Sequence, residues 1–152
     1  MSETGERNDP YSAFNFLIEI DDVYPDGKTV VAGFSECSGL DNETDVIEYR
    51  NGNEDITVRK LPGLRKYTNI TLKRGYTQSR ELWKWRKAVE EGRTQRKSGA
   101  IVLLNEARKE ALRWEFVFGW PSKWQGPALN AGSSEVAIET LEIACEGIVL
   151  AD

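Results

Sequence analysis

The sequence predicts one mainly β domain, an antiparallel β-sandwich or β-barrel with a single α-helix on its outside. Three patterns indicate this fold. Residues 112–120 place large apolar side chains on alternate positions, as in a strand with one buried face. Residues 100–104 (AIVLL) form a short continuous apolar run, which is typical of a strand covered on both faces. Residues 79–91 combine a helix start, an apolar stripe at helical spacing and a glycine just past the end.

Composition excludes several classes of function. The chain has 152 residues, a length that suits one domain with its own core, and 39% of them are hydrophobic. Its net charge of −5 argues against nonspecific nucleic-acid binding, which needs a basic surface. The chain has no histidine, which removes the commonest general base and most zinc sites, and it has no glycine-rich phosphate loop. We therefore expect no enzyme and no bound cofactor or metal.

The cysteines and the N-terminus bear on the compartment. Cys37 and Cys145 are expected to be reduced thiols in or near the core, because free cysteine is often buried. The first ten residues are polar and charged, without the apolar region of a secretion signal. No run approaches the ~18 apolar residues that cross a membrane. We expect synthesis in a cytoplasm, with release by lysis or as part of a particle for any extracellular form.

The N-terminal part predicts a hairpin. Residues 1–12 are expected to be a flexible lead-in. Residues 13–21 predict a strand that places Phe14, Phe16, Ile18 and Ile20 on one face. The sequence YPDG at residues 24–27 is a turn signal, because proline fixes φ and glycine tolerates positive φ. Residues 28–36 then predict a second strand, which we expect to pair with the first.

Residues 41–62 predict a different kind of hairpin, with a turn at Asn51-Gly52-Asn53. Apolar and charged residues are mixed on both of its faces, so neither face suits the core of the domain. Because an isolated two-stranded hairpin is marginal in water, three alternatives stay open: a mobile arm, an arm that packs on another subunit, and a solvated hairpin. The candidate inter-subunit residues are Asp45, Ile47, Glu48, Tyr49, Arg50, Ile56, Val58 and Arg59.

A strand over residues 64–74 precedes the predicted helix. Ser79 is the expected N-cap, and Leu82, Trp85 and Val89 line one helical face. Residues 80–97 contain seven basic and three acidic residues, a net charge of +4 on an otherwise acidic chain. Such a helix either docks an acidic partner or presents a solvated face. The candidate docking residues are Arg80, Lys84 and Lys87.

The C-terminal part predicts two further features. Leu112, Trp114, Phe116, Phe118 and Trp120 are expected on one face of a strand that ends at Pro121, because proline gives a sheet no N–H. A final strand begins near residue 134. Its apolar positions change parity after residue 138, which predicts a β-bulge within residues 139–141.

Six phrases in this order carry a family resemblance over residues 10–149: FNFLIEID, GFSECSGL, DVIEYRNG, RKLPGLRKYTNITLKRG, LWKWR and WEFVFGWPSKWQGPALNAGSSEVAIETLEIACEGI. With these phrases the chain resembles the inner-tube proteins of contractile injection systems, the family that includes the tail tube protein of contractile-tailed phages. The departures are small. Cys145 stands where many relatives carry histidine, and the turn at residues 24–28 is longer than in short relatives.

The resemblance implies a tube. The expected protomer forms hexameric rings that stack into a hollow tube, and the segment at residues 41–62 contacts neighbouring subunits. A surrounding sheath would contract and drive the tube through a target membrane, and the basic helix would face that sheath. The implied partners are further copies of this chain, a sheath protein, baseplate, spike and tube-terminating proteins, and a luminal cargo of protein toxin or DNA. Assembly would occur in a bacterial cytoplasm, in a phage tail or a phage tail-like particle.

Three other functions are considered. Two are close in kind: a tube-initiator ring at the baseplate, and a secreted tube-like ring protein that chaperones effectors. The third is a monomeric ligand-binding β-barrel, for which the chain would be monomeric and would enclose a ligand-sized pocket.

Overall fold

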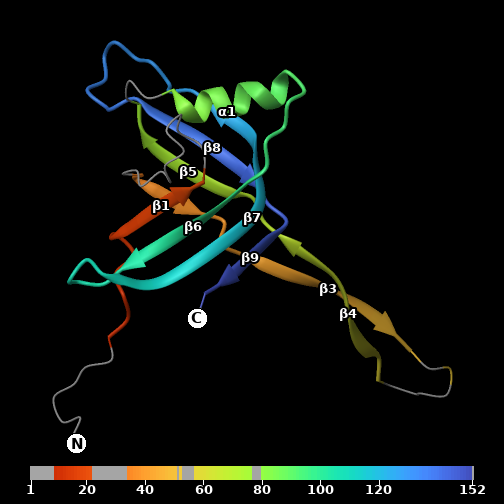
Figure 1. Cartoon of the computed structure of the whole chain (residues 1–152). Helices are drawn as coiled ribbons and strands as arrows, with labels where there is room; N and C mark the ends of the chain where they lie inside the picture. Colours follow the sequence, from red (N-terminus) through yellow and green to blue (C-terminus); the bar gives the residue numbers. More distant parts are fainter. Residues whose placement is uncertain (1–8, 22–33, 51, 53–56, 77–79, 152) are drawn as a thin grey trace, which may run out of the picture.

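Nine strands and one helix make up the fold in the part of the chain that the computed structural model describes, residues 9–21, 34–50, 52, 57–76 and 80–151 (Figure 1). The elements are β1 Phe16–Ile20, β2 Glu36–Ser38, β3 Asn42–Tyr49, β4 Arg59–Tyr67, β5 Ile70–Gly75, α1 Glu81–Glu90, β6 Lys97–Leu104, β7 Glu110–Gln125, β8 Ile138–Ala144 and β9 Gly147–Leu150. The expected lead-in, the turn at residues 24–27, most of the strand at residues 28–36 and the N-cap Ser79 lie wholly or largely outside the described residues.

Two sheets share the long strand β7. Its first part, up to Gly119, pairs with β6 on one side and with β9 on the other, and β6 pairs with β1. Its last part, from Trp120, pairs with β8, which continues through β5 to β2. We call β1-β6-β7-β9 the first sheet and β7-β8-β5-β2 the second sheet. All of these pairs are antiparallel, as the sequence predicts.

A β-bulge in β7 lets one strand serve both sheets. Gly119 pairs with Lys97 and Phe116 pairs with Gly99, so β7 carries an extra residue between these pairs. Within the bulge Phe118 has a φ of 53°, and its side chain is 55% exposed. The prediction that Phe118 shares the buried face of Phe116 is therefore wrong, because the bulge interrupts the alternation of side chains.

The predicted strand end at Pro121 is also wrong, since β7 continues to Gln125. A second irregularity of the ladder falls between Pro121 and Lys123. Proline is tolerated at bulges, where the regular ladder of backbone hydrogen bonds is already interrupted. The Pro121 carbonyl accepts a hydrogen bond from Nη1 of Arg86 on α1 at 3.2 Å, which ties the helix to the bend of β7.

The main core lies between the two sheets and under α1. Its largest fully buried side chains come from both sheets and the helix: Ile18, Ile20, Ile70, Leu72, Leu82, Phe116, Leu141 and Ile143. The Phe116 ring fits between two glycines. A Cβ at Gly99 would lie 2.6 Å from its Cζ, and one at Gly119 would lie 2.8 Å from its Cε2. The aromatic ring therefore depends on both positions remaining glycine.

Strand β6 confirms the interpretation of its apolar run. Ile101 belongs to the main core, whereas Ala100, Val102 and Leu104 form a second buried cluster on the opposite face, against Leu17. On the same face of the first sheet as this cluster, Arg113 on β7 forms an ion pair with Glu19 on β1. The distance between Arg113 Nη2 and Glu19 Oε2 is 2.6 Å. A strand in the middle of the first sheet is thus covered on both faces.

The predicted bulge in the last strand is wrong, and a buried charge explains the pattern. Strand β8 pairs with β5 in continuous register from Ile138 to Ile143. Glu139 occupies a core-facing position with 3% of its surface exposed, where the apolar alternation would require a hydrophobic residue. Its Oε2 accepts a hydrogen bond from Nε of buried Arg74 at 2.9 Å. The chain instead breaks after Ala144, and Gly147–Leu150 forms β9 in the first sheet.

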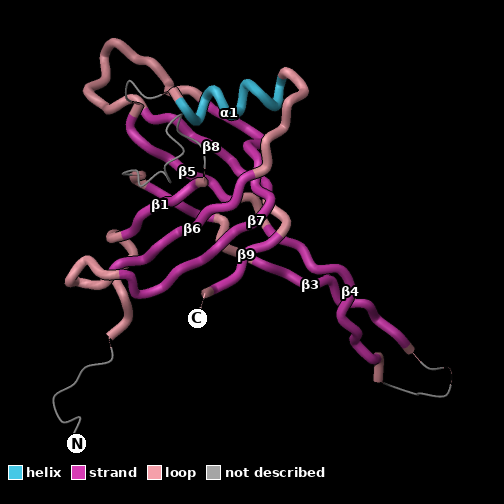
Figure 2. Tube along the Cα trace, viewed as in Figure 1, coloured by secondary structure: helices cyan, strands magenta, loops and turns pink. Residues whose placement is uncertain are grey.

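Strands β3 and β4 form a separate two-stranded sheet, which we call the arm, and the remainder is called the body. The arm projects from the body (Figures 1 and 2). A single strand over residues 64–74 was expected, and this prediction is wrong, because β4 ends at Tyr67 and β5 begins at Ile70. The arm therefore extends past Pro62 as far as Tyr67.

Candidate functional site

The arm carries a large amount of exposed apolar surface. Six large hydrophobic side chains in or next to its strands are 44–74% exposed, and they are Val46, Ile47, Tyr49, Val58, Leu61 and Leu64. Exposed apolar side chains concentrated in one element are typical of a site of contact with another protein.

Both faces of the arm are apolar in part. Ile47 lies opposite Leu61 in the register, so these two side chains share a face. Val46 lies opposite Pro62, and this pair occupies the other face because successive residues alternate. A hairpin at the surface of its own domain would hide one of these faces. The arm instead exposes apolar side chains on both faces.

The two strands of the arm differ in charge. Strand β3 is acidic, with Glu43, Asp45 and Glu48, whereas β4 is basic, with Arg59, Lys60, Arg65 and Lys66. An ion pair joins the two strands between Lys66 Nζ and Asp45 Oδ1 at 3.1 Å. One long edge of the arm is therefore acidic and the other basic. Such an arm is complementary to a second arm packed beside it in the same orientation.

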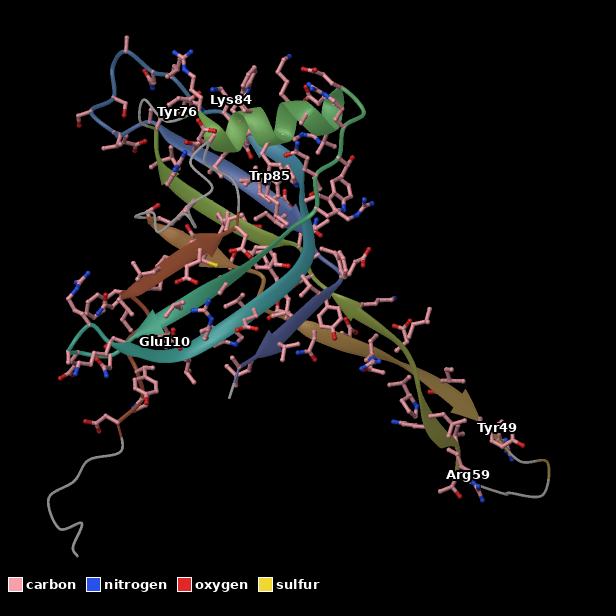
Figure 3. All side chains as sticks on the ribbon, in the orientation of Figure 1. Tyr49, Arg59, Tyr76, Lys84, Trp85 and Glu110 are labelled. Carbon is pink, nitrogen blue, oxygen red and sulfur yellow. The ribbon has the colours of Figure 1, made fainter. Side chains whose placement is uncertain are left out.

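Most of the candidate inter-subunit residues lie in the arm or next to it. Asp45, Ile47, Glu48 and Tyr49 belong to β3 and Arg59 begins β4, while Arg50 and Val58 flank these strands. Tyr49 and Arg59 are at the outer end of the arm (Figure 3). Ile56 is outside the described residues. Sequence reasoning did not select Leu61 and Leu64. The spacing of apolar residues in residues 58–67 could have identified them as part of a strand. Pro62 and Gly63 interrupt this spacing, and this made the strand hard to recognise.

The helix α1 separates a buried face from a basic face. Leu82 and Trp85 are buried, and Trp85 Nε1 donates a hydrogen bond to the Gln95 carbonyl at 2.8 Å. Figure 3 shows Trp85 pointing toward the sheets and Lys84 pointing away from them. Lys87 Nζ lies 5.2 Å from the centre of the half-exposed Trp83 ring, a cation–π contact at the surface.

The ends of α1 agree in part with the sequence. Arg80 occupies the N-cap position and makes no side-chain capping bond, and Ser79 lies outside the described residues. Gly92 follows the helix with a φ of +82°, as predicted for a residue that ends a helix. Arg80, Lys84 and Lys87 are all exposed, so the three candidate docking residues are available to a partner.

A family model settles the identity. The model of the T4-like virus tail tube protein gp19 matches residues 12–149. The chain belongs to this family. It is therefore a structural, non-enzymatic tail tube subunit of a phage tail or contractile injection system. No curated protein sequence matches the chain.

Solved structures agree with this membership. A chain of the extended PVC sheath–tube complex, from an extracellular contractile injection system, is 25% identical, with a TM-score of 0.82 over 95% of this chain and 93% of that one. A chain of the anti-feeding prophage tube-terminating cap is 26% identical, with a TM-score of 0.83 over 95% and 93%. A chain of the 6-fold symmetrised anti-feeding prophage baseplate is 25% identical, with a TM-score of 0.84 over 95% and 97%.

The chemistry of this tail tube protein is that of a scaffold. Burial raises the pKa of the Cys37 thiol to about 12, with a smaller contribution from Glu36, and burial also raises the pKa of Cys145. Both thiols are free.

Among the residues that the structure describes, no group of three His, Cys, Asp or Glu residues could hold a metal ion. No described helix has the length and apolarity needed to cross a membrane.

Proposed function

We propose that copies of this chain form hexameric rings that stack into the hollow inner tube of a contractile particle. A sheath drives this tube through a target membrane, and the lumen conducts a cargo of protein toxin or DNA. The single observation that carries the proposal is the arm, which has exposed apolar side chains on both faces and projects from a body with a complete core. The 6-fold symmetry of the baseplate structure that contains a similar chain supports the number of subunits in a ring.

The first sheet offers a way to close the ring. Among the described strands, β1 pairs only with β6 and β9 pairs only with β7, so these two strands are the outer strands of the first sheet as the structure describes it. Outer strands whose edges are exposed promote association between chains. Pairing of β1 in one subunit with β9 in the next would join the first sheets into one continuous barrel around the lumen. This contact is heterologous, and a heterologous contact closes when its rotation returns to the start.

The arm would then join each subunit to its neighbours. Its two apolar faces suit two different contacts, and its acidic and basic edges suit head-to-tail packing of identical arms. The inter-subunit residues of this proposal are those predicted from the sequence, Asp45, Ile47, Glu48, Tyr49, Arg50, Ile56, Val58 and Arg59, together with Leu61 and Leu64.

The basic face of α1 would dock the sheath. Arg80, Lys84 and Lys87 are exposed, and α1 lies on the outside of the second sheet (Figure 1). Exposed ion pairs are individually weak, about 0–1 kcal/mol each. Contacts of this strength would hold a sheath in register and still release during contraction. The similar chain in a sheath–tube complex supports a sheath protein as partner.

The remaining partners and the location follow from the same particle. Similar chains in baseplate and tube-cap structures support contacts with a baseplate, its spike and a tube-terminating protein. Assembly would take place in a bacterial cytoplasm, and an injection particle would act outside the cell after release.

A second candidate is a tube-initiator ring, which the baseplate structure favours because it contains a similar chain. Counting copies separates the two functions. A main tube subunit should be about as abundant as the sheath protein in purified particles, whereas an initiator should be present in far fewer copies. Quantitative mass spectrometry of isolated particles measures this ratio.

Electron microscopy of the purified protein tests the main proposal. Negative-stain images should show hollow tubes or 6-fold rings at raised protein concentration. A protein that stays monomeric in analytical sedimentation at every concentration tested would refute the proposal.

A further inference from the structure

We propose that the base of the arm is a rigid clasp that holds the arm in its docking orientation before assembly, with Gly39 and Thr68 as its positioning residues. The clasp consists of residues 39–41, which lead from β2 into β3, and residues 67–69, which are the last residue of β4 and the connection to β5. This inference rests on the proposed function, because it assigns the clasp a role in tube growth.

Hydrogen bonds join the two connections directly. Thr68 Oγ1 donates to the Gly39 carbonyl at 2.9 Å, and the Thr68 backbone N–H donates to the Asp41 carbonyl at 3.4 Å. One threonine therefore bonds the outgoing connection to the returning one twice. Rotation of the arm about its base would have to break these bonds.

The backbone at Gly39 is in close contact with the other connection. Its φ is +90°, a conformation that side-chain-bearing residues rarely adopt. A Cβ at this position would lie 2.0 Å from the Asn69 carbonyl oxygen. Only glycine lets the two connections approach this closely, so the tight base of the arm depends on Gly39.

Side chains anchor both connections to the body. Leu40 on the first connection and Tyr67 at the end of β4 are half-buried, and both pack against the main core. A hairpin joined by two loose loops would have no such contacts. The polar bonds of Thr68 and the apolar contacts of Leu40 and Tyr67 together fix the direction in which the arm leaves the body.

A fixed direction favours assembly. The apparent affinity of a subunit for a growing tube falls in proportion to the fraction of subunits whose arm already points correctly. An arm free to sample many directions would also lose that freedom at each addition, at a cost in binding free energy. The clasp removes this cost in the free subunit, although its residues lie at the base of the arm and not along the exposed apolar side chains that we propose as the contact surface.

The first test replaces Thr68 by valine, which keeps the branched shape and removes the hydroxyl donor. NMR order parameters of β3 and β4 amides are measured on subunits kept below the concentration at which tubes form. Wild-type arm amides should have the value of rigid backbone, about 0.85, and the Thr68→Val arm should fall toward about 0.6. The threshold concentration for tube growth should rise about threefold to tenfold, as expected for loss of one hydrogen bond. Thr71→Val on β5 is the matched control and should change neither value.

A second pair of variants tests the glycine. Gly39→Ala introduces both positive-φ strain and the clash with Asn69, and it should loosen the arm and raise the threshold more than Thr68→Val does. Gly92→Ala introduces similar strain at φ +82° with no atom within 4 Å of the new Cβ, at the end of α1 and away from the arm. It should leave the arm order parameters and the threshold unchanged.

The outcomes separate the clasp from the proposed function. Unchanged arm order parameters in both Thr68→Val and Gly39→Ala would overturn the clasp, and so would a loosened arm that assembles at the wild-type threshold. If the wild-type protein forms no tubes, the proposed function fails, while the order parameters still report whether the clasp holds the arm.

Discussion

The body and the arm of this chain treat apolar side chains in opposite ways. In the body Phe116 is 1% exposed, and residues from two sheets and a helix surround it. In the arm Leu64 is 74% exposed, and apolar residues on both faces are exposed to solvent. The body completes its own core, whereas the arm presents surface that other copies can bury. Stability and assembly should therefore respond to different residues.

The largest effect is expected from disrupting the arm by replacing most of β3 and the residues that follow it. Replacement of residues 45–55 by a short Gly-Ser linker should abolish stacking into tubes. The free energy of unfolding of the body should change by less than about 1 kcal/mol, because no core residue is altered. Near-UV circular dichroism and chemical denaturation measure the fold, and electron microscopy measures stacking. Normal tubes from this variant would contradict the contrast between arm and body.

The basic face of α1 is a surface distinct from both the core of the body and the arm. Reversal of its charge should reduce sheath assembly and leave tube formation intact. The triple variant Arg80→Glu, Lys84→Glu and Lys87→Glu should form normal tubes but assemble few sheaths around them, because the charge complementarity with the sheath is lost. Counting sheathed and bare tubes in electron micrographs measures the effect.

The same charge change away from α1 is the control for that experiment. Arg96→Glu, Arg108→Glu and Lys109→Glu alter three exposed basic residues outside the helix. Sheaths should assemble normally on this variant. Equal losses in both triple variants would mean that net charge, and not the face of α1, controls sheath assembly.

Two phenylalanines in β7 sharpen the comparison within the body itself. Phe116→Ala should lower the free energy of unfolding by about 4 kcal/mol, because it empties a packed site between two glycines. Phe118→Ala should lower it by less than about 1 kcal/mol, because the bulge turns this side chain outward. Urea denaturation measures both values. Equal losses of unfolding free energy in the two variants would mean that the alternation of buried and exposed side chains continues through residue 118.

Disruption of the buried ion pair between Arg74 and Glu139 should have a smaller effect on stability than Phe116→Ala. Glu139→Leu leaves the Arg74 guanidinium buried without its carboxylate partner. This variant should lower the free energy of unfolding by about 3 kcal/mol. Adding Arg74→Met should restore part of that loss because it removes the unpaired buried charge, whereas the Trp124 Nε1–H still lacks the Glu139 Oε1 that accepts its hydrogen bond at 3.1 Å. A double variant no more stable than the single one would show that Arg74 is held by other groups.

Local patterns predicted much of the fold. The alternation at Trp114 and Phe116, the apolar run of β6 and the glycine after α1 each depend on neighbouring residues, and the structure contains all three features. The arm was found because its composition does not suit a core. These signals come from the spacing of residues in one segment, which a single sequence displays.

The errors came from long-range contacts. Glu139 was interpreted as part of a bulge because its partner Arg74 is distant in the sequence. The positive φ of Phe118 and the continuation of β7 past Pro121 depend on which strands lie on either side of β7. The clasp was also not predicted, because Gly39 and Thr68 meet only after the arm has folded.

The sharing of β7 between two sheets has a mechanical consequence. Each sheet holds part of the same covalent strand, from Glu110 to Gln125. A pull on the first sheet reaches the second through peptide bonds, and not through side-chain contacts between separate layers. Parting the sheets would require sliding β7 along β6 or β8 and breaking many backbone hydrogen bonds together. A subunit thrust against an envelope would therefore transmit force along its length without its two layers separating.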